Sequence, residues 1–74
     1  MIIFTQHALL KLKQRNISKT LVLQTLNQPE QISPTRQNRF VAFKKFGKLH
    51  LKVIFRKENK NIIVITQHLV EKII

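Results

Sequence analysis

The first residues combine a short apolar run with a helical spacing of leucines. Residues 1–4 are all apolar and predict an initial strand. Thr5 is suited to cap a helix from about Gln6 to Arg15, because its hydroxyl can accept a bond from a backbone N–H that the helix leaves unpaired. One side of this helix is predicted to be apolar and to consist of Ala8, Leu9 and Leu12.

A second helix is predicted directly after the first. Asn16 tolerates a left-handed backbone conformation and is therefore a suitable end for the first helix. Ser18 can cap a second helix that continues to about Leu26, and the Asn-Gln-Pro run at residues 27–29 closes it. Because the connection between the two helices is very short, we expect them to form a helical hairpin.

After Pro34 the period of apolar residues changes from that of a helix to that of strands. Tight turns separate three predicted strands, which cover residues 39–46, 49–55 and 61–68. The middle strand alternates cleanly between its two faces. One face carries Leu49, Leu51, Val53 and Phe55, and the other carries His50, Lys52, Ile54 and Arg56.

These elements predict an α+β fold, in which an N-terminal helical hairpin packs on one face of an antiparallel meander and leaves the other face free. With 74 residues the chain has room for one domain, so we expect residues 1–74 to form a single unit. Apolar residues make up 43% of the chain, enough for a core, although a core of this size supplies only about 3–5 kcal/mol. Further stability is expected to come from a partner chain. The apolar tail, residues 69–74, is expected to cover an edge of the core; contact with a partner protein or a second copy is the alternative.

Composition excludes several kinds of site. The chain has no cysteine, so it has no disulfide, thiolate metal site or cysteine nucleophile. It has no Gly-rich phosphate loop and no pair of carboxylates for two-metal chemistry. The few groups that could bind a metal are scattered, and we expect neither a metal nor a small-molecule cofactor. They are His7, His50, His68, Glu30, Glu58 and Glu71.

Charge is the most informative property of the composition. The chain has 14 Lys and Arg residues against 3 Asp and Glu, which gives a formal net charge of +11. Such an excess costs stability through self-repulsion and indicates a polyanionic or acidic partner. A membrane is not expected to be that partner, because the apolar runs are far shorter than the roughly 20 residues that a spanning helix needs. The opening lacks the basic start of a signal peptide, so a cytoplasmic protein is expected.

Two groups of basic residues are candidates for binding nucleic acid. On the first helix, His7, Lys11 and Arg15 follow one another at intervals of four and share one side. This stripe is either a solvated helix face, with His7 bonded to a neighbouring loop, or a surface that contacts phosphate, with His7 available for proton transfer. On the strands, a cationic face is predicted that suits an anion better than water, and it carries Arg39, Lys45, His50, Lys52 and Arg56.

Metal-free cleavage of RNA is the enzymatic reaction that these residues can support. The 2′-hydroxyl of RNA is itself the nucleophile, so the protein has to supply only cations for the phosphate and one or two groups for proton transfer. Lys52 and Arg56 are the candidates for holding the phosphate. His7 and His68 are the candidates for moving the proton.

The order of these residues resembles that of a widespread bacterial family of small proteins. Residues 4–18 read F-T-Q-H-A-L-L-K-L-K-Q-R-N-I-S, and the family typically has His-Ala, then Arg, then Arg-Gly-Ile-Ser. The L-N-Q-P run at 26–29 stands where the family's second helix ends in Asn-Pro. Two further runs, L-K-V-I-F at 51–55 and I-V-I-T at 63–66, are similar to its last two strands.

That family looks like part of the RelE/ParE-like toxin superfold, which also groups with barnase-type ribonucleases. The resemblance implies metal-independent cleavage of RNA, on the ribosome or free, and inhibition by an acidic antitoxin. Three positions depart from the family pattern. Lys11 replaces an Arg and loses its bidentate fork, Asn16 replaces a Gly, and His68 replaces an aromatic residue, commonly Tyr.

The sequence thus leaves three functions open. The first is a toxin-like endoribonuclease with catalytic His68, Arg56, Lys52 and His7. The second is a non-catalytic basic module that docks on RNA, the ribosome or another protein, and the third is a gyrase-type inhibitor on the same fold. We expect the strand faces that carry Lys52, Arg56, Thr66 and His68 to coincide, with His7 reaching the same pocket.

Overall fold

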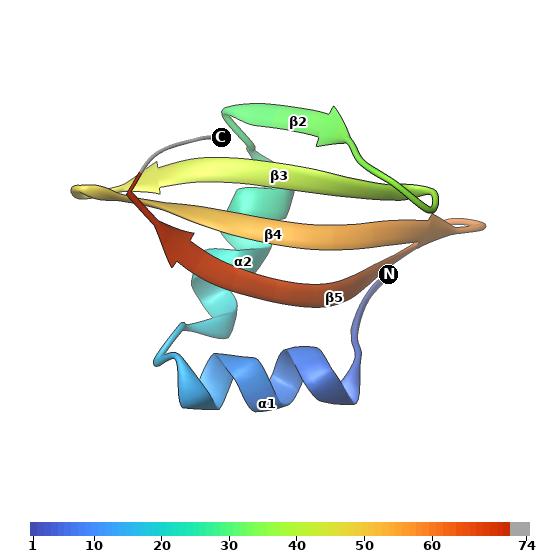
Figure 1. Cartoon of the computed structure of the whole chain (residues 1–74). Coiled ribbons are helices and arrows are strands. Elements are labelled where there is room, and N and C mark those ends of the chain that lie inside the picture. Colours follow the sequence, from blue (N-terminus) through green and yellow to red (C-terminus); the bar gives the residue numbers. More distant parts are fainter. Residues whose placement is uncertain (72–74) are drawn as a thin grey trace.

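The computed structural model describes residues 1–71, which form two helices and five strands. In chain order the elements are β1 (Ile2–Phe4), α1 (Gln6–Gln14), α2 (Lys19–Asn27), β2 (Gln31–Pro34), β3 (Arg39–Phe46), β4 (Leu49–Glu58) and β5 (Asn61–Val70). The predicted α+β class is confirmed, and both helices and all four predicted strands, the initial one included, are present (Figure 1).

Side-chain hydroxyls start both helices, as the sequence predicts. The Oγ1 atom of Thr5 accepts a hydrogen bond from the backbone N–H of Ala8 at 3.0 Å. The Oγ atom of Ser18 accepts one from Thr20 at 3.1 Å. Between the helices Asn16 has a φ of 55°, the left-handed conformation that ends α1.

The sheet is mixed and wider than the predicted meander. Strands β2 to β5 are antiparallel neighbours, whereas β1 pairs with β5 in parallel, giving the order β1-β5-β4-β3-β2. The edge strand β2 is not predicted by the sequence, because its four residues are polar at two positions and include Pro34. Proline is tolerated at a sheet edge, where its missing N–H removes no ladder bond.

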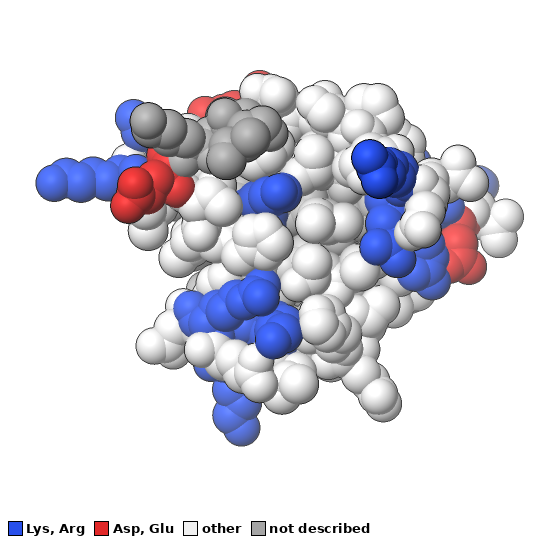
Figure 2. Space-filling view, viewed as in Figure 1, with Lys and Arg blue, Asp and Glu red and all other residues white. Residues whose placement is uncertain are grey.

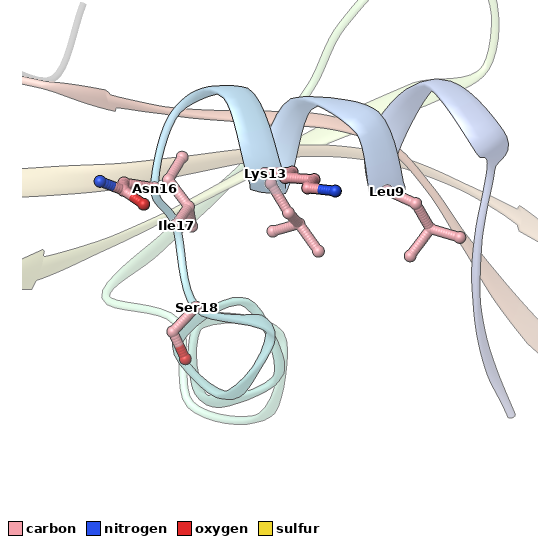
Figure 3. A pocket seen from close by; sticks show the side chains of 6 residues that line it. Leu9, Lys13, Asn16, Ile17 and Ser18 are labelled. Atoms are coloured by element: carbon pink, nitrogen blue, oxygen red, sulfur yellow. The ribbon is translucent and has the colours of Figure 1, made fainter.

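The two helices cover one face of the sheet but do not form a hairpin against each other. α1 packs on β5 and β1, whereas α2 packs on β4 and β3. Figure 3 looks along α2 while α1 lies across the view, so the two helices cross steeply. The prediction of a helical hairpin was therefore right about the short connection and wrong about the packing, because each helix covers a different part of a wide sheet.

The core lies between the helices and the inner face of the sheet. Ala8 of α1 and Val22 of α2 are fully buried, and on β4 the inward positions Leu51 and Val53 are fully buried as predicted. Leu9 was predicted to join them, but its side chain is 47% exposed because it points away from β5.

Two left-handed residues turn the chain between the long strands. Gly47 has a φ of 64° between β3 and β4, and Asn59 has a φ of 56° between β4 and β5. β5 continues to Val70, so the first two residues of the predicted tail belong to a strand. Glu71 follows the strand, and residues 72–74 of the predicted tail lie outside the described residues. Neither helix within residues 1–71 has the length and hydropathy needed to cross a bilayer.

Leu51 and Leu10 provide a matched test of this core. We expect Leu51→Ala to lower the free energy of unfolding by about 2–5 kcal/mol, because it leaves a cavity between β4 and the helices. Leu10→Ala should change it by less than about 0.5 kcal/mol, since Leu10 is exposed. Urea unfolding followed by circular dichroism measures both, and equal midpoints for the two variants would contradict the packing described above.

Candidate nucleic-acid interface

The cationic residues of the three long strands lie together on the outer face, which we define as the sheet face turned away from the helices. Strand register fixes which residues lie side by side, because residues paired across antiparallel strands point to the same face. Three cross-strand rows carry the charge. They are Lys45 and His50 with Val70, Phe43 and Lys52 with His68, and Arg39 and Arg56 with Ile63.

Figure 2 views the outer face from the same side as Figure 1, where β4 passes in front of α2. Lys and Arg side chains gather above α1, at the centre of the sheet and at its right-hand end. Apolar residues separate these groups, and Val41 and Phe43 between them are buried. The outer face therefore carries several separate cationic sites.

His68, Lys52 and Arg15 form the first of these sites, which we call the His68 site. Lys52 is paired directly with His68 across β4 and β5, which places their Cβ atoms about 4.5–5.5 Å apart. Arg15, just beyond α1, reaches the same ring, with its Nη1 atom 3.1 Å from the Nδ1 atom of His68. The same Nη1 donates to the backbone carbonyl oxygen of Gln67 at 2.8 Å.

The surroundings of His68 favour its neutral form. Burial of the ring lowers the pKa of His68 below its ordinary value of 6.5, and the positive charges of Lys52 and Arg15 lower it further. Because a guanidinium can only donate, the Nδ1 atom of His68 has to accept, and the ring proton then resides on Nε2. His68 is thus a neutral imidazole held between two cations.

The edge of β5 explains why Arg15 lies there. β1 pairs only with the first part of β5, up to Val64, and within residues 1–71 the rest of that edge has no strand partner. α1 runs along the uncovered part. Thr5 Oγ1 donates to the backbone carbonyl of Ile65, and the buried side-chain amide of Gln67 donates through Nε2 to the backbone carbonyl of Ala8 at 2.9 Å. Arg15 completes this attachment at the far end of the helix.

Arg56 shares the outer face with His68 but belongs to a second site. It lies four positions further along β4 than Lys52, a distance of about 13 Å. It lies opposite Arg39, and its Nη2 atom forms an ion pair with the carboxylate of Glu58 at 2.8 Å. The expectation that these strand faces coincide is met, although one phosphate cannot contact both Arg56 and His68.

Lys45 and His50 extend the His68 site along the sheet. They pair with each other across β3 and β4, one row beyond Lys52, which is about 7 Å away along the strand. The Nδ1 atom of His50 is buried and has no hydrogen-bond partner in the described part of the chain. These two residues can contact a second phosphate next to the one at Lys52.

The stripe on α1 lies beside the outer face, and only its last member reaches His68. Lys11 donates to the side chain of Gln14 at 3.0 Å. His7 is exposed near the start of α1, about 12 Å along the helix axis from Arg15. The structure therefore does not place His7 in the pocket with His68, where the sequence analysis expected it.

A hollow on the other side of α1 is separate from these sites. It measures about 470 Å³, lies at the junction of α1 and α2, and is wide open to solvent (Figure 3). Its lining residues are Leu9, Leu12, Lys13, Asn16, Ile17 and Ser18. With one charged side chain it has none of the paired chemistry of the His68 site. Across residues 1–71, no three His, Asp or Glu side chains come close enough together to hold a metal ion.

Sequence reasoning found the residues of the His68 site but not its central contact. Arg15 and His68 are 53 positions apart, and no local spacing indicates that a helix end meets the last strand. Gln67 was missed although a signal existed. Its neighbour His68 points outward, so alternation places Gln67 on the core face, where a buried amide needs a partner.

The low pKa of His68 makes stability depend on pH. Unfolding restores the ordinary pKa of 6.5, so the unfolded chain binds a proton that the folded chain does not. We therefore expect the free energy of unfolding to fall as the pH is lowered through 6.5. His68→Gln should weaken this dependence and the exposed His7→Gln should retain it. Urea midpoints above and below pH 6.5 measure the effect, and a wild-type protein that becomes more stable on acidification would contradict it.

Comparison with known proteins identifies the family. No curated protein and no solved structure matches the chain. Residues 4–66 match the family described as Domain of unknown function (DUF4258), a match that runs from the end of β1 into β5. It includes Arg15, Lys52 and Arg56 and ends two residues before His68. Because most of its length is matched, the chain belongs to the DUF4258 family.

Proposed function

We propose that the outer face binds RNA and that the protein is a metal-independent endoribonuclease of the toxin type, with His68 as its proton acceptor. One observation carries this proposal: a neutral histidine lies directly opposite Lys52 and 3.1 Å from Arg15 on a cationic sheet face. A base beside two phosphate-binding cations is the minimum that RNA cleavage requires.

The charge balance supports a polyanionic ligand. Two of the chain's three acids are engaged by residues other than His68, Lys52 and Arg15, since Glu58 pairs with Arg56 and Glu30 accepts a bond from the backbone N–H of Lys45. The cations around His68 are thus left for a ligand. RNA carries phosphates at regular spacing, so one RNA molecule can contact several separate cationic sites on the outer face. A single small anion can contact only one of them.

Cleavage at this site would proceed by attack within the RNA. The 2′-oxygen bonds to phosphorus and the P–O5′ bond breaks, which leaves a 2′,3′-cyclic phosphate and a 5′-hydroxyl. His68 takes the proton of the 2′-hydroxyl, and the leaving 5′-oxygen takes one from water. Lys52 and Arg15 stabilise the charge on the phosphate, a contribution of about 2.7–4 kcal/mol for one such donor in other enzymes.

The remaining basic residues take binding roles in this proposal. Arg56 and Arg39 hold a phosphate further along the same RNA strand, because they are about 13 Å from Lys52. Lys45 and His50 hold one on the other side. His7 and Lys11 contact the RNA from the flank of α1 and take no part in proton transfer.

The arrangement of elements agrees with a RelE-like toxin, which we propose as the fold. Two consecutive helices cover one face of an antiparallel four-stranded segment, and the opposite face carries the cations. Toxins of this kind act in the cytoplasm on free or ribosome-bound RNA. A charge of +11 on this fold suits neutralisation by an acidic antitoxin, which we propose as the protein partner.

A non-catalytic RNA-binding module is the second candidate, and one contact favours it. Arg15 occupies the Nδ1 atom of His68, the only nitrogen of the neutral ring that could accept a proton. As long as this contact persists, His68 can donate a hydrogen bond and cannot act as a base. Binding without cleavage would then be the function of the same face.

RNA binding is tested with two lysines that differ in position. Lys52→Gln should weaken binding of single-stranded RNA severalfold and reduce its salt dependence, because one phosphate contact is lost. Lys13→Gln, which removes the same charge beside the hollow of α1, should change both much less. Fluorescence anisotropy over a range of salt concentrations measures this, and equal effects of the two substitutions would argue against the outer face.

Cleavage is tested with and without a chelator. We expect wild-type protein to cut total RNA or the mRNA of translating ribosomes in EDTA, and His68→Gln to lose about 10²–10⁴-fold in rate. His7→Gln should keep most of the activity. Binding without cleavage in the wild type would favour the non-catalytic module. Activity lost on chelation and restored by a metal would overturn the proposed mechanism.

A further inference from the structure

A single nitrogen atom of Arg15 joins the helix, the strand edge and the histidine. Its Nη1 carries two N–H groups, one directed at the carbonyl oxygen of Gln67 at 2.8 Å and the other at the Nδ1 atom of His68 at 3.1 Å. Both donors of Nη1 are therefore used within the protein, while the N–H groups of Nε and Nη2 form no hydrogen bond within residues 1–71. Arg15 is nevertheless exposed, so a ligand can reach its guanidinium.

The two acceptors of this nitrogen differ in strength. A phosphate oxygen is a charged acceptor, and hydrogen bonds between an ionised donor and an ionised acceptor are roughly twice as strong as neutral ones. The Nδ1 atom of His68 is a neutral acceptor. A phosphate at Lys52, directly opposite His68, would therefore be a stronger partner than the ring for the second N–H of the Nη1 atom of Arg15.

We propose that Arg15 is a latch on His68 that a bound phosphate group opens. The planar guanidinium shifts as a whole, so that a phosphate oxygen replaces Nδ1 at one N–H of Nη1 while the other N–H keeps its bond to the carbonyl of Gln67. The Nδ1 atom is then free to accept a proton. This inference rests on the proposed function, since it names how the RNA itself would switch its own site from the blocked to the basic state.

The latch couples proton binding to anion binding in both directions. A phosphate that draws Arg15 away adds a negative charge near the ring and removes a donor from Nδ1, so protonation of His68 becomes easier. By linkage, protonation of His68 strengthens anion binding to the same degree. The charged groups that face the ring are Arg15 from α1 and Lys52 from β4, while β3 contributes Phe43 in the same row and Lys45, with His50, in the next.

The tautomer follows from the same geometry and gives the experiment a direct signal. In the latched state the nitrogen-15 resonances of His68 should be those of an unprotonated Nδ1 that accepts a hydrogen bond and an Nε2 that carries a proton. Opening the latch removes the bond to Nδ1 and leaves the Nε2 proton in place. A purely structural role of Arg15 would leave both resonances unaffected by phosphate.

Nuclear magnetic resonance of the His68 ring, with inorganic phosphate as the probe, tests the latch. We expect phosphate to raise the pKa of His68 in the wild-type protein. In Arg15→Gln the pKa should already be higher without phosphate and should respond less to it. Lys13→Gln, which removes one charge from the same helix on the side of the hollow, should behave like the wild type.

A conservative variant separates the latch from charge alone. Arg15→Lys keeps the positive charge but offers no planar fork. The pKa of His68 should therefore be lower in Arg15→Lys than in Arg15→Gln, but the tautomer of the ring should not be fixed. Identical His68 titrations of wild type and Arg15→Gln, with and without phosphate, would overturn the proposal. Ring shifts as predicted in a protein that cuts no RNA would support the latch and contradict the nuclease.

Discussion

The packing of α1 along the uncovered edge of β5 is the contact on which the site depends. A strand edge exposes backbone groups that need partners, and here the helix supplies them at both of its ends. The hydroxyl of Thr5 donates to the backbone carbonyl of Ile65, and the guanidinium of Arg15 donates to that of Gln67. The side-chain amide of Gln67 donates in turn to the backbone carbonyl of Ala8. The last of these contacts brings a guanidinium from the inner layer of the fold to the outer face of the sheet.

The charges around His68 determine what the contact between Arg15 and the ring does. Burial of the ring disfavours a protonated His68 and the cations at Lys52 and Arg15 repel one, so the pKa of His68 is lowered and the neutral ring is favoured. The same cations attract phosphate. A bound phosphate would place a negative charge next to the ring and so favour its protonated form. A cluster that costs stability in the free protein is thus arranged to gain energy from a polyanion, as expected for a small domain with a charge of +11.

Local patterns predicted the elements of the fold, and distant pairings account for what they missed. The caps at Thr5 and Ser18 and the alternation of β4 depend on neighbouring residues, and they are as expected. The parallel pairing of β1 with β5 joins residues about sixty positions apart, which no pattern of apolar residues encodes. The same division holds for the candidate site. Alternation predicted that Lys52, His68 and Arg56 share one face. The contact of Arg15 with His68, and the distance of His7 from His68, depend on how α1 packs against β5.

The proposed function requires that RNA contact the outer face around His68. Mapping amide chemical shifts during titration with a short single-stranded RNA tests it most directly. We expect the largest changes on β4 and β5 near Lys52 and His68 and at the end of α1 near Arg15, with little change at the exposed Leu23 of α2. Changes confined to α2 and the hollow beside Lys13, with β4 and β5 unaffected, would contradict RNA binding by the outer face.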